Sequence, residues 1–192
     1  MEKKKITIIG AGMMGSALAF PAAENGHEVH IVGTCLDDKI IDGYLATGKH
    51  EKFCRPFPEN VNYHYFKDWK TVVEGSDFVI GGVSSFGVDW FLEEILIQLD
   101  PEMPVLSVTK GLRATDDGSL LSYPGYWMSE LAKRGIHRDI CAVGGPCTSY
   151  ELVFKDPTEV AFCGWDNEVL RMMKQAMQRP YYHISLTNDV IG

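Results

Sequence analysis

The amino-acid sequence predicts an α/β fold in which helices cover a doubly wound, largely parallel sheet. Three observations support this prediction. Short apolar runs rich in Val and Ile take turns with helical patterns along nearly the whole chain of 192 residues. A Gly-x-Gly-x-x-Gly pattern separates the first apolar run from the first helical pattern. No internal repeat, low-complexity tract or linker interrupts this alternation, so we expect one domain over residues 1–192.

The first predicted unit is a compact strand–helix–strand arrangement. Residues 6–9 form an apolar, β-branched run that predicts a strand, and the small-residue stretch at 16–23 predicts a helix. Asn25-Gly26 supplies the stop signal of that helix, and residues 28–32 predict the second strand. Pro21 falls inside the predicted helix, so we expect a kink or an early end there.

The later elements continue the alternation. Residues 33–60 are polar and rich in Gly, Pro and charge, which predicts an excursion with one short helix near 39–45. Further strands are predicted at 61–66, 78–83, 105–109, 140–143, 159–163 and 181–186. Further helices are predicted at 68–74 with Asp68 as cap, at 86–99 ended by Asp100-Pro101, at 119–134 interrupted at Pro124-Gly125, at 147–154 and at 168–178.

The glycine pattern predicts a site for the pyrophosphate of a dinucleotide. Gly10 allows a tight turn from strand to helix, Gly12 lets the backbone approach the phosphates, and Gly15 lets the helix pack closely on the strand. Amide groups at the start of the helix would then face the anion. The alternative is an ordinary glycine-rich turn, but the flanking strands and helix favour a Rossmann-type dinucleotide-binding unit.

Two other predicted strands end in small and polar residues, at Val83-Ser84-Ser85 and at Thr109-Lys110-Gly111. Because the carboxyl ends of parallel strands share one edge of the sheet, we expect both segments to open beside the glycine pattern. The ammonium group of Lys110 could there reach a phosphate or polarise a carbonyl oxygen. The alternative is a solvated loop lysine.

The loop Gly144-Gly145-Pro146-Cys147 precedes another predicted helix. It is a candidate for a second anion site at a helix start, although a plain structural turn is an equally good interpretation. A nucleophilic role for Cys147 is not favoured, because no histidine lies nearby in the sequence. The histidines also lack metal-ligand spacing, so no metal site is predicted.

Bulk properties exclude several classes of partner. A formal net charge of −8 repels polyanions, so nucleic acid is not an expected partner, while a small phosphorylated ligand remains compatible. Five cysteines without a Cys-x-x-Cys pattern favour a reducing, cytoplasmic location. The N-terminus imitates a secretory signal, but cleavage after Pro21-Ala22-Ala23 would discard the glycine unit, so we reject that interpretation. No apolar run is long enough to predict a membrane span.

With these motifs assembled, the sequence resembles the N-terminal half of the NAD(P)-dependent glycerol-3-phosphate dehydrogenases of bacteria and some archaea. The resemblance runs almost end to end. It rests on segments 10–19, 25–29 and 107–112, on Gly144-Gly145-Pro146 followed by Glu151, on Pro157-Thr158, and on Asn188-Asp189-Val190-Ile191-Gly192.

The resemblance implies an activity and a set of site residues. The family reaction is reversible hydride transfer between NAD(P)H and C2 of dihydroxyacetone phosphate, which gives sn-glycerol 3-phosphate for phospholipid synthesis. The cofactor, NAD or NADP, would be held by Gly10, Gly12, Met13, Met14, Gly15, Thr34, Val83, Ser85, Lys110 and Ser149. Lys110 would also act in catalysis and, with Gly145 and Cys147, contact the small phosphorylated substrate.

Several positions depart from the family pattern. Thr34 stands where many members carry an Arg that pairs with the 2′-phosphate of NADP, and no Asp or Glu replaces it. The choice between NAD and NADP therefore stays open. Ser84, Gly144 and Cys147 also replace the family's usual Pro, Ser and Ser or Thr.

The resemblance implies that an all-helical domain follows Gly192 in the family and supplies a general acid/base lysine. That domain is absent from this sequence, so we expect a chain cut at the domain boundary that binds cofactor better than it turns over substrate. Apolar surface normally covered by such a domain would favour a homo-oligomer. Two alternatives stay open: another reductase of the 6-phosphogluconate-dehydrogenase-like group, such as a ketopantoate reductase, and a non-catalytic nucleotide-binding module.

Overall fold

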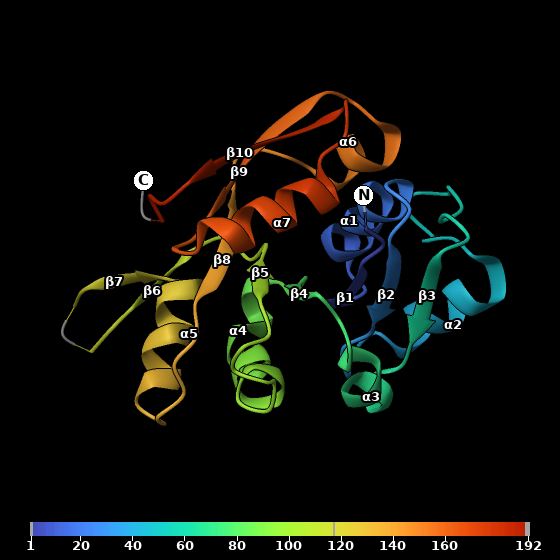
Figure 1. Cartoon of the computed structure of the whole chain (residues 1–192). Helices are drawn as coiled ribbons and strands as arrows, with labels where there is room; N and C mark the ends of the chain where they lie inside the picture. Colours follow the sequence, from blue (N-terminus) through green and yellow to red (C-terminus); the bar gives the residue numbers. More distant parts are fainter. Residues whose placement is uncertain (1, 117, 191–192) are drawn as a thin grey trace.

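The computed structural model describes residues 2–116 and 118–190, which form a three-layer α/β structure around one main sheet (Figure 1). In the described part of the chain this sheet has eight strands in the order β10-β9-β8-β5-β4-β1-β2-β3. Neighbouring strands are parallel except for the antiparallel pair β8 and β9. The predicted doubly wound, largely parallel sheet is therefore confirmed. The strands are β1 (Lys5–Ile9), β2 (Glu28–Val32), β3 (Val61–His64), β4 (Phe78–Gly81), β5 (Val105–Ser107), β8 (Ile140–Gly144), β9 (Thr158–Cys163) and β10 (Tyr182–Thr187).

Helices cover both faces of the sheet (Figure 1). One layer contains α1 (Met13–Glu24), α2 (Asp38–Thr47), α6 (Ser149–Phe154) and α7 (Asn167–Met177). The other layer contains α3 (Trp69–Val73), α4 (Val88–Phe91) and α5 (Tyr123–Ala132), with a π-helical segment, η3 (Leu92–Leu96), that continues α4, and with short 3-10 turns η1 (Phe66–Asp68) and η2 (Ser85–Gly87). Among the described residues, no helix combines the length and apolar character needed to cross a bilayer.

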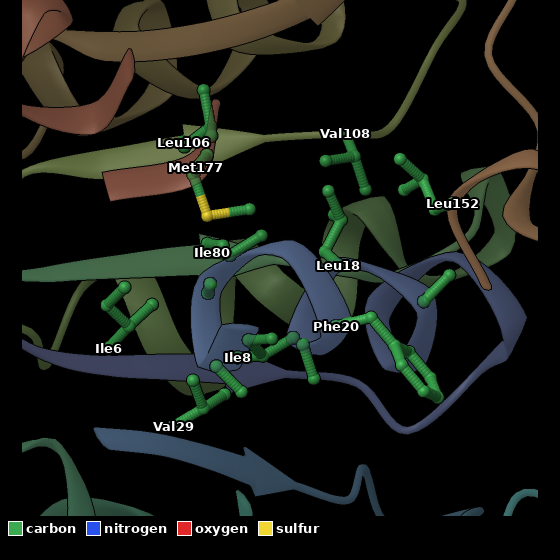
Figure 2. Close-up of a cluster of buried hydrophobic side chains, with 14 of the residues drawn as sticks. Ile6, Ile8, Leu18, Phe20, Val29, Ile80, Leu106, Val108, Leu152 and Met177 are labelled. Carbon is green, nitrogen blue, oxygen red and sulfur yellow. The ribbon is translucent and has the colours of Figure 1, made fainter. Parts of the chain in front are cut away.

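Two hydrophobic cores follow from this layering, one on each face of the sheet. Alternate residues of a strand point to opposite faces, so Ile8 packs with α1 and α7 while Ile9 packs with α3 and α4. Figure 2 shows part of the first core, in which Leu18 of α1 and Met177 of α7 lie over the sheet. Complete burial of each such side chain contributes about 1.5–3 kcal/mol. The continuous apolar runs in the sequence reflect a sheet that is buried on both faces.

Two local predictions were wrong, and of the kink or early end expected at Pro21 the early end is not found. Helix α1 continues past Pro21 to Glu24, and the Asn25 amide donates to the Pro21 carbonyl oxygen at 3.2 Å. Residues 119–122 are not helical: the two short strands β6 (Leu112–Ala114) and β7 (Leu120–Ser122) form an antiparallel hairpin that projects from the body (Figure 1). Helix α5 begins only at Tyr123, because Pro124 fits the first turn of a helix. Asp68 makes no side-chain cap at α3.

A pair of histidines on the edge strand β3 and its neighbour β2 predicts acid sensitivity. His30 Nδ1 on β2 lies 2.9 Å from His64 Nε2 on β3, and His30 Nε2 lies 2.9 Å from Glu28 Oε1. Burial lowers the pKa of His30 and of His64, and the positive charge of Lys5 lowers both pKa values further. Glu28 raises the pKa of His30, and Asp68 raises that of His64, but each offsets the lowering only in part. A lowered folded-state pKa means that the unfolded chain binds more protons, so stability present above about pH 6.5 is lost as the pH falls.

We therefore expect a lower urea midpoint at about pH 5 than at about pH 7.5. His64→Gln, whose neutral side chain can still form hydrogen bonds but cannot titrate, should make this pH dependence shallower. Parallel pH profiles of the wild type and the variant would show that the pair plays no part.

Candidate functional site

The glycine loop between β1 and α1 contains two positions that only glycine can occupy. Gly10 has a φ of +114°, and a Cβ atom placed there would lie 2.8 Å from the carbonyl oxygen of Gly82. A Cβ atom on Gly15 would collide with the carbonyl oxygen of Gly10. Helix α1 therefore starts in direct backbone contact with β1 and with the end of β4. This close packing agrees with the roles predicted for both glycines.

The start of α1 leaves its backbone amides free. Gly12 is the N-cap and offers no side chain to accept a hydrogen bond, and the first intrahelical bond runs from the Ser16 amide to the Gly12 oxygen at 2.9 Å. Within the described residues, the amides of Met13, Met14 and Gly15 have no acceptor. Unpaired amides and the positive end of the helix dipole make this position attractive to an anion.

Hydrogen bonds to the backbone amide and carbonyl groups of Ala11 hold the glycine loop in place. Its amide donates to Asp37 Oδ2 at 3.1 Å, and its carbonyl oxygen accepts from the Tyr44 hydroxyl at 2.9 Å and from Ser16 Oγ at 3.0 Å. Burial raises the pKa of Tyr44, which keeps its hydroxyl a neutral donor. The loop is therefore fixed in one conformation before any ligand arrives.

A cleft of about 380 Å³ opens beside the glycine loop at the carboxyl ends of β4, β5 and β8. Met14 and Val83 line it, together with Thr109 and Lys110, which follow β5. Thr109 Oγ1 donates to the Val83 oxygen at 2.7 Å, which ties the end of β5 to the end of β4. The predicted meeting of these strand ends at one edge of the sheet is therefore confirmed.

Lys110 is exposed and is hydrogen bonded through Nζ to the carbonyl oxygen of Gly145. This contact brings together two residues that are far apart in the sequence. Cys147 is only 7% exposed and lines the same cleft. Burial raises the pKa of the Cys147 thiol, and a hydrogen bond with Thr158 and the charge of Lys110 oppose this only in part. A protonated thiol fits the interpretation that Cys147 is not a nucleophile.

A second cleft, of about 310 Å³, lies on the other side of Gly12. Its walls include the apolar side chains of Leu36, Phe86 and Trp90, and Phe86 is 99% exposed. Gly12 and Gly82 line both clefts. The two clefts thus form two ends of one groove that crosses the glycine loop, a shape that suits a ligand with two ring systems joined by a phosphate bridge.

Some of the remaining predicted site residues line the two clefts and others do not. Thr34 lines the second cleft, Ser85 the first, and Val83 both. Ser149 is half-buried as the first residue of α6 and lines neither cleft. Residues 191 and 192, the last two of the Asn188–Gly192 motif, lie outside the described residues.

Several residues of the groove were not predicted from the sequence, among them the apolar wall residues Leu36, Phe86 and Trp90. Two others, Gly82 and Asp37, had a signal in the sequence. Gly82 follows β4 and approaches the glycine loop closely, and the Gly81-Gly82 doublet after an apolar run was its signal. Asp37 lines the second cleft and is the N-cap residue of α2, and its signal was an Asp directly before a predicted helix.

Another cavity, of about 570 Å³, lies at the opposite, amino ends of β5 and β8 and is lined by Arg138. Arg138 donates through Nη2 to the carbonyl oxygens of Leu99 and Asp100 at 2.8 and 2.6 Å, and so holds the end of the segment that follows η3. Because ligands of parallel sheets bind at the carboxyl ends of the strands, the groove is the better candidate.

Comparisons with known proteins agree with this geometry. The chain is 30% identical over 187 residues to an NADP(+)-dependent glycerol-3-phosphate dehydrogenase of Archaeoglobus fulgidus, covering 97% of this chain and 54% of the relative. The chain therefore spans about half the length of the curated relatives it matches.

Solved structures show the same fold. The structure of a glycerol-3-phosphate dehydrogenase from Coxiella burnetii matches with a TM-score of 0.83 at 21% identity, over 98% of this chain and 55% of that one. A ketopantoate reductase from Ralstonia eutropha matches with a TM-score of 0.66 at 15% identity, over 97% of this chain and 57% of that one. At such identities the likeness concerns the fold alone.

The family is decided by sequence. A model of a protein family, described as the NAD-dependent glycerol-3-phosphate dehydrogenase N-terminus, matches residues 5–170. This match covers most of the chain and includes the glycine loop, Lys110 and Cys147. The chain belongs to the family of NAD-dependent glycerol-3-phosphate dehydrogenase N-terminal domains.

Proposed function

We propose that this chain is the cofactor-binding part of an enzyme that transfers a hydride between NAD(P)H and C2 of dihydroxyacetone phosphate to give sn-glycerol 3-phosphate. The observation that carries the proposal is the uncapped start of α1, which opens into the same cleft as Lys110. Membership of the family and the name of the Archaeoglobus relative support the choice of substrate. The all-helical part of the enzyme would complete the substrate site.

Different parts of the groove would bind different parts of the coenzyme. The amides at the start of α1, from Gly12 to Gly15, hold the pyrophosphate of the cofactor. The cleft with Leu36 and Phe86 takes the adenosine end, because apolar walls suit a base. The cleft with Lys110 takes the nicotinamide end, and the nicotinamide supplies or accepts the hydride.

Lys110 contributes electrostatic stabilisation in this proposal. When the substrate carbonyl is reduced, negative charge develops on its oxygen, and a fixed cation nearby lowers the barrier. The contact of Lys110 with the Gly145 oxygen would be exchanged for one with substrate and cofactor. Gly145 and Cys147 would line the substrate position, and Ser149 would contact the cofactor only if the start of α6 approaches the groove on binding.

The chain's own surface supports a cytoplasmic location for the enzyme. All five cysteines are unpaired, and Cys35 and Cys54 are exposed, which suits a reducing compartment. Exposed apolar side chains on the β6–β7 hairpin, Leu112 at 61% and Leu120 at 62%, would favour self-association of the 192-residue chain.

Two measurements test the proposal on this chain. Titration of NADH or NADPH, followed by coenzyme fluorescence, should show saturable binding. A rate assay should show reduction of dihydroxyacetone phosphate at less than about a hundredth of the rate of a full-length family member, because the resemblance assigns the general acid/base lysine to the other part of the enzyme. Absence of binding for both coenzymes would contradict the proposal, and turnover at the full-length rate would contradict the division of roles.

A further inference from the structure

We infer that Asp37 makes the adenosine end of the groove select NADH over NADPH. The inference rests on the proposed function and deepens it, because it names the coenzyme. Its basis is a fixed carboxylate at the point where the ribose of a cofactor bound to the glycine loop would lie.

Three hydrogen bonds hold this carboxylate in place. Asp37 Oδ2 accepts from the Thr34 amide at 2.8 Å, from Thr34 Oγ1 at 2.9 Å and from the Ala11 amide at 3.1 Å. The last of these bonds joins Asp37 to the residue directly before Gly12, the N-cap of α1. Asp37 is half-buried and lines the adenosine-side cleft. The carboxylate therefore stands between the phosphate-binding amides and the apolar walls that would hold the base.

The second oxygen of this carboxylate is available to a ligand. Within the described residues, Oδ1 of Asp37 accepts no hydrogen bond, while Oδ2 takes all three. A ribose hydroxyl is a donor, so Oδ1 can accept from it. A 2′-phosphate offers acceptor oxygens and negative charge instead, and it would be repelled by the same atom.

The cleft offers no cation to offset this repulsion. None of its lining residues in the described part of the chain is Lys, Arg or His. A neighbouring cleft that shares Cys35 with this one is lined by Lys67, whose Nζ lies 5.6 Å from the centre of the Tyr65 ring. Asp38 lines that neighbouring cleft as well and opposes its charge. An Arg at Thr34 would have supplied the missing partner, and the sequence lacks it.

Asp37 also has a structural role, so the test needs a variant that preserves it. Asp37→Asn keeps the size of the side chain and one oxygen that can accept from the Thr34 and Ala11 amides, but it removes the charge. Asp38→Asn makes the same change of charge at the neighbouring, exposed residue and serves as the matched control.

The experiment measures Kd for NADH and for NADPH by coenzyme fluorescence on the wild-type chain and on both variants, with thermal unfolding as a check of folding. We expect the wild type to bind NADH at least about tenfold more tightly than NADPH. Asp37→Asn should lower this ratio at least about fivefold, mainly through tighter NADPH binding, and Asp38→Asn should leave it within about twofold.

The wild-type ratio needs no variant, so the inference stays testable if Asp37→Asn fails to fold. The Archaeoglobus relative is named for NADP(+), which makes this ratio a discriminating measurement. Equal or tighter NADPH binding by the wild type would overturn the inference and leave the proposed function standing. The same holds if the ratio is unchanged in folded Asp37→Asn. Failure of both coenzymes to bind would instead remove the proposed function, and the inference with it.

Discussion

Replacement of Lys110 by Ala is expected to lower kcat/KM for dihydroxyacetone phosphate by about 10²–10³-fold in an active enzyme that includes the substrate-binding part. The physical reason is loss of the cation that faces the reacting oxygen in the proposed mechanism. Lys110 is exposed, and within the described residues its side chain has one hydrogen bond, to the Gly145 oxygen, so the fold should tolerate its removal. Steady-state kinetics and chemical unfolding, measured on the same preparation, check both statements.

The unfolding free energy of Lys110→Ala should stay within about 0.5 kcal/mol of the wild type, as for most exposed substitutions. Lys133→Ala is the matched control, because Lys133 is another exposed lysine and forms an ion pair with Glu130 on helix α5, which covers the opposite face of the sheet from α1. If activity and stability fell together in Lys110→Ala, or if Lys133→Ala lost as much activity, Lys110 would not have the proposed role.

Replacement of Gly12 by Ala is expected to weaken coenzyme binding at least about tenfold while the fold is retained. A Cβ atom at Gly12 meets nothing within 4 Å among residues 2–116 and 118–190, so it would occupy the open groove that the pyrophosphate needs. The cost to the helix N-cap should stay below about 1 kcal/mol. Fluorescence titration of NADH and a urea unfolding curve measure the two quantities separately.

Gly15→Ala provides the contrast. Its Cβ atom would collide with the carbonyl oxygen of Gly10, so helix α1 must move away from β1. We expect this variant to lose stability as well as binding, by more than about 2 kcal/mol. If Gly12→Ala bound NADH as the wild type does, the pyrophosphate could not lie against Gly12.

Much of the fold was predictable because local pattern and tertiary environment agree. The strand at residues 6–9 is β-branched and buried on both faces, and the glycine loop behind it admits no alternative packing. The hairpin β6–β7 was not predictable for the opposite reason. Its strands have three residues each and are largely exposed, so they lack the alternation that marks a strand. The antiparallel direction of β9 relative to β8 was not predictable either, because the residue pattern of a strand does not encode the direction of its neighbour.

The site was predictable in its backbone and less so in its side chains. Glycines and strand-end residues such as Lys110 have sequence signals, because topology alone brings the carboxyl ends of parallel strands together. The position of Asp37 depends on how residues 33–37 fold back, and no periodicity encodes that turn. Ser149 was assigned by resemblance alone, and it lines neither cleft, since α6 starts away from the groove.

Binding of a nicotinamide coenzyme by the backbone amides at the start of α1 can be observed through amide chemical shifts of the isotope-labelled chain during titration with NADH. If these amides hold the pyrophosphate, the largest shifts fall on Gly12, Met13, Met14 and Gly15, with smaller ones at the ends of β2 and β4. Saturable NADH binding that leaves these four amides unshifted, and moves amides around Arg138 instead, would show that the pyrophosphate is not held there.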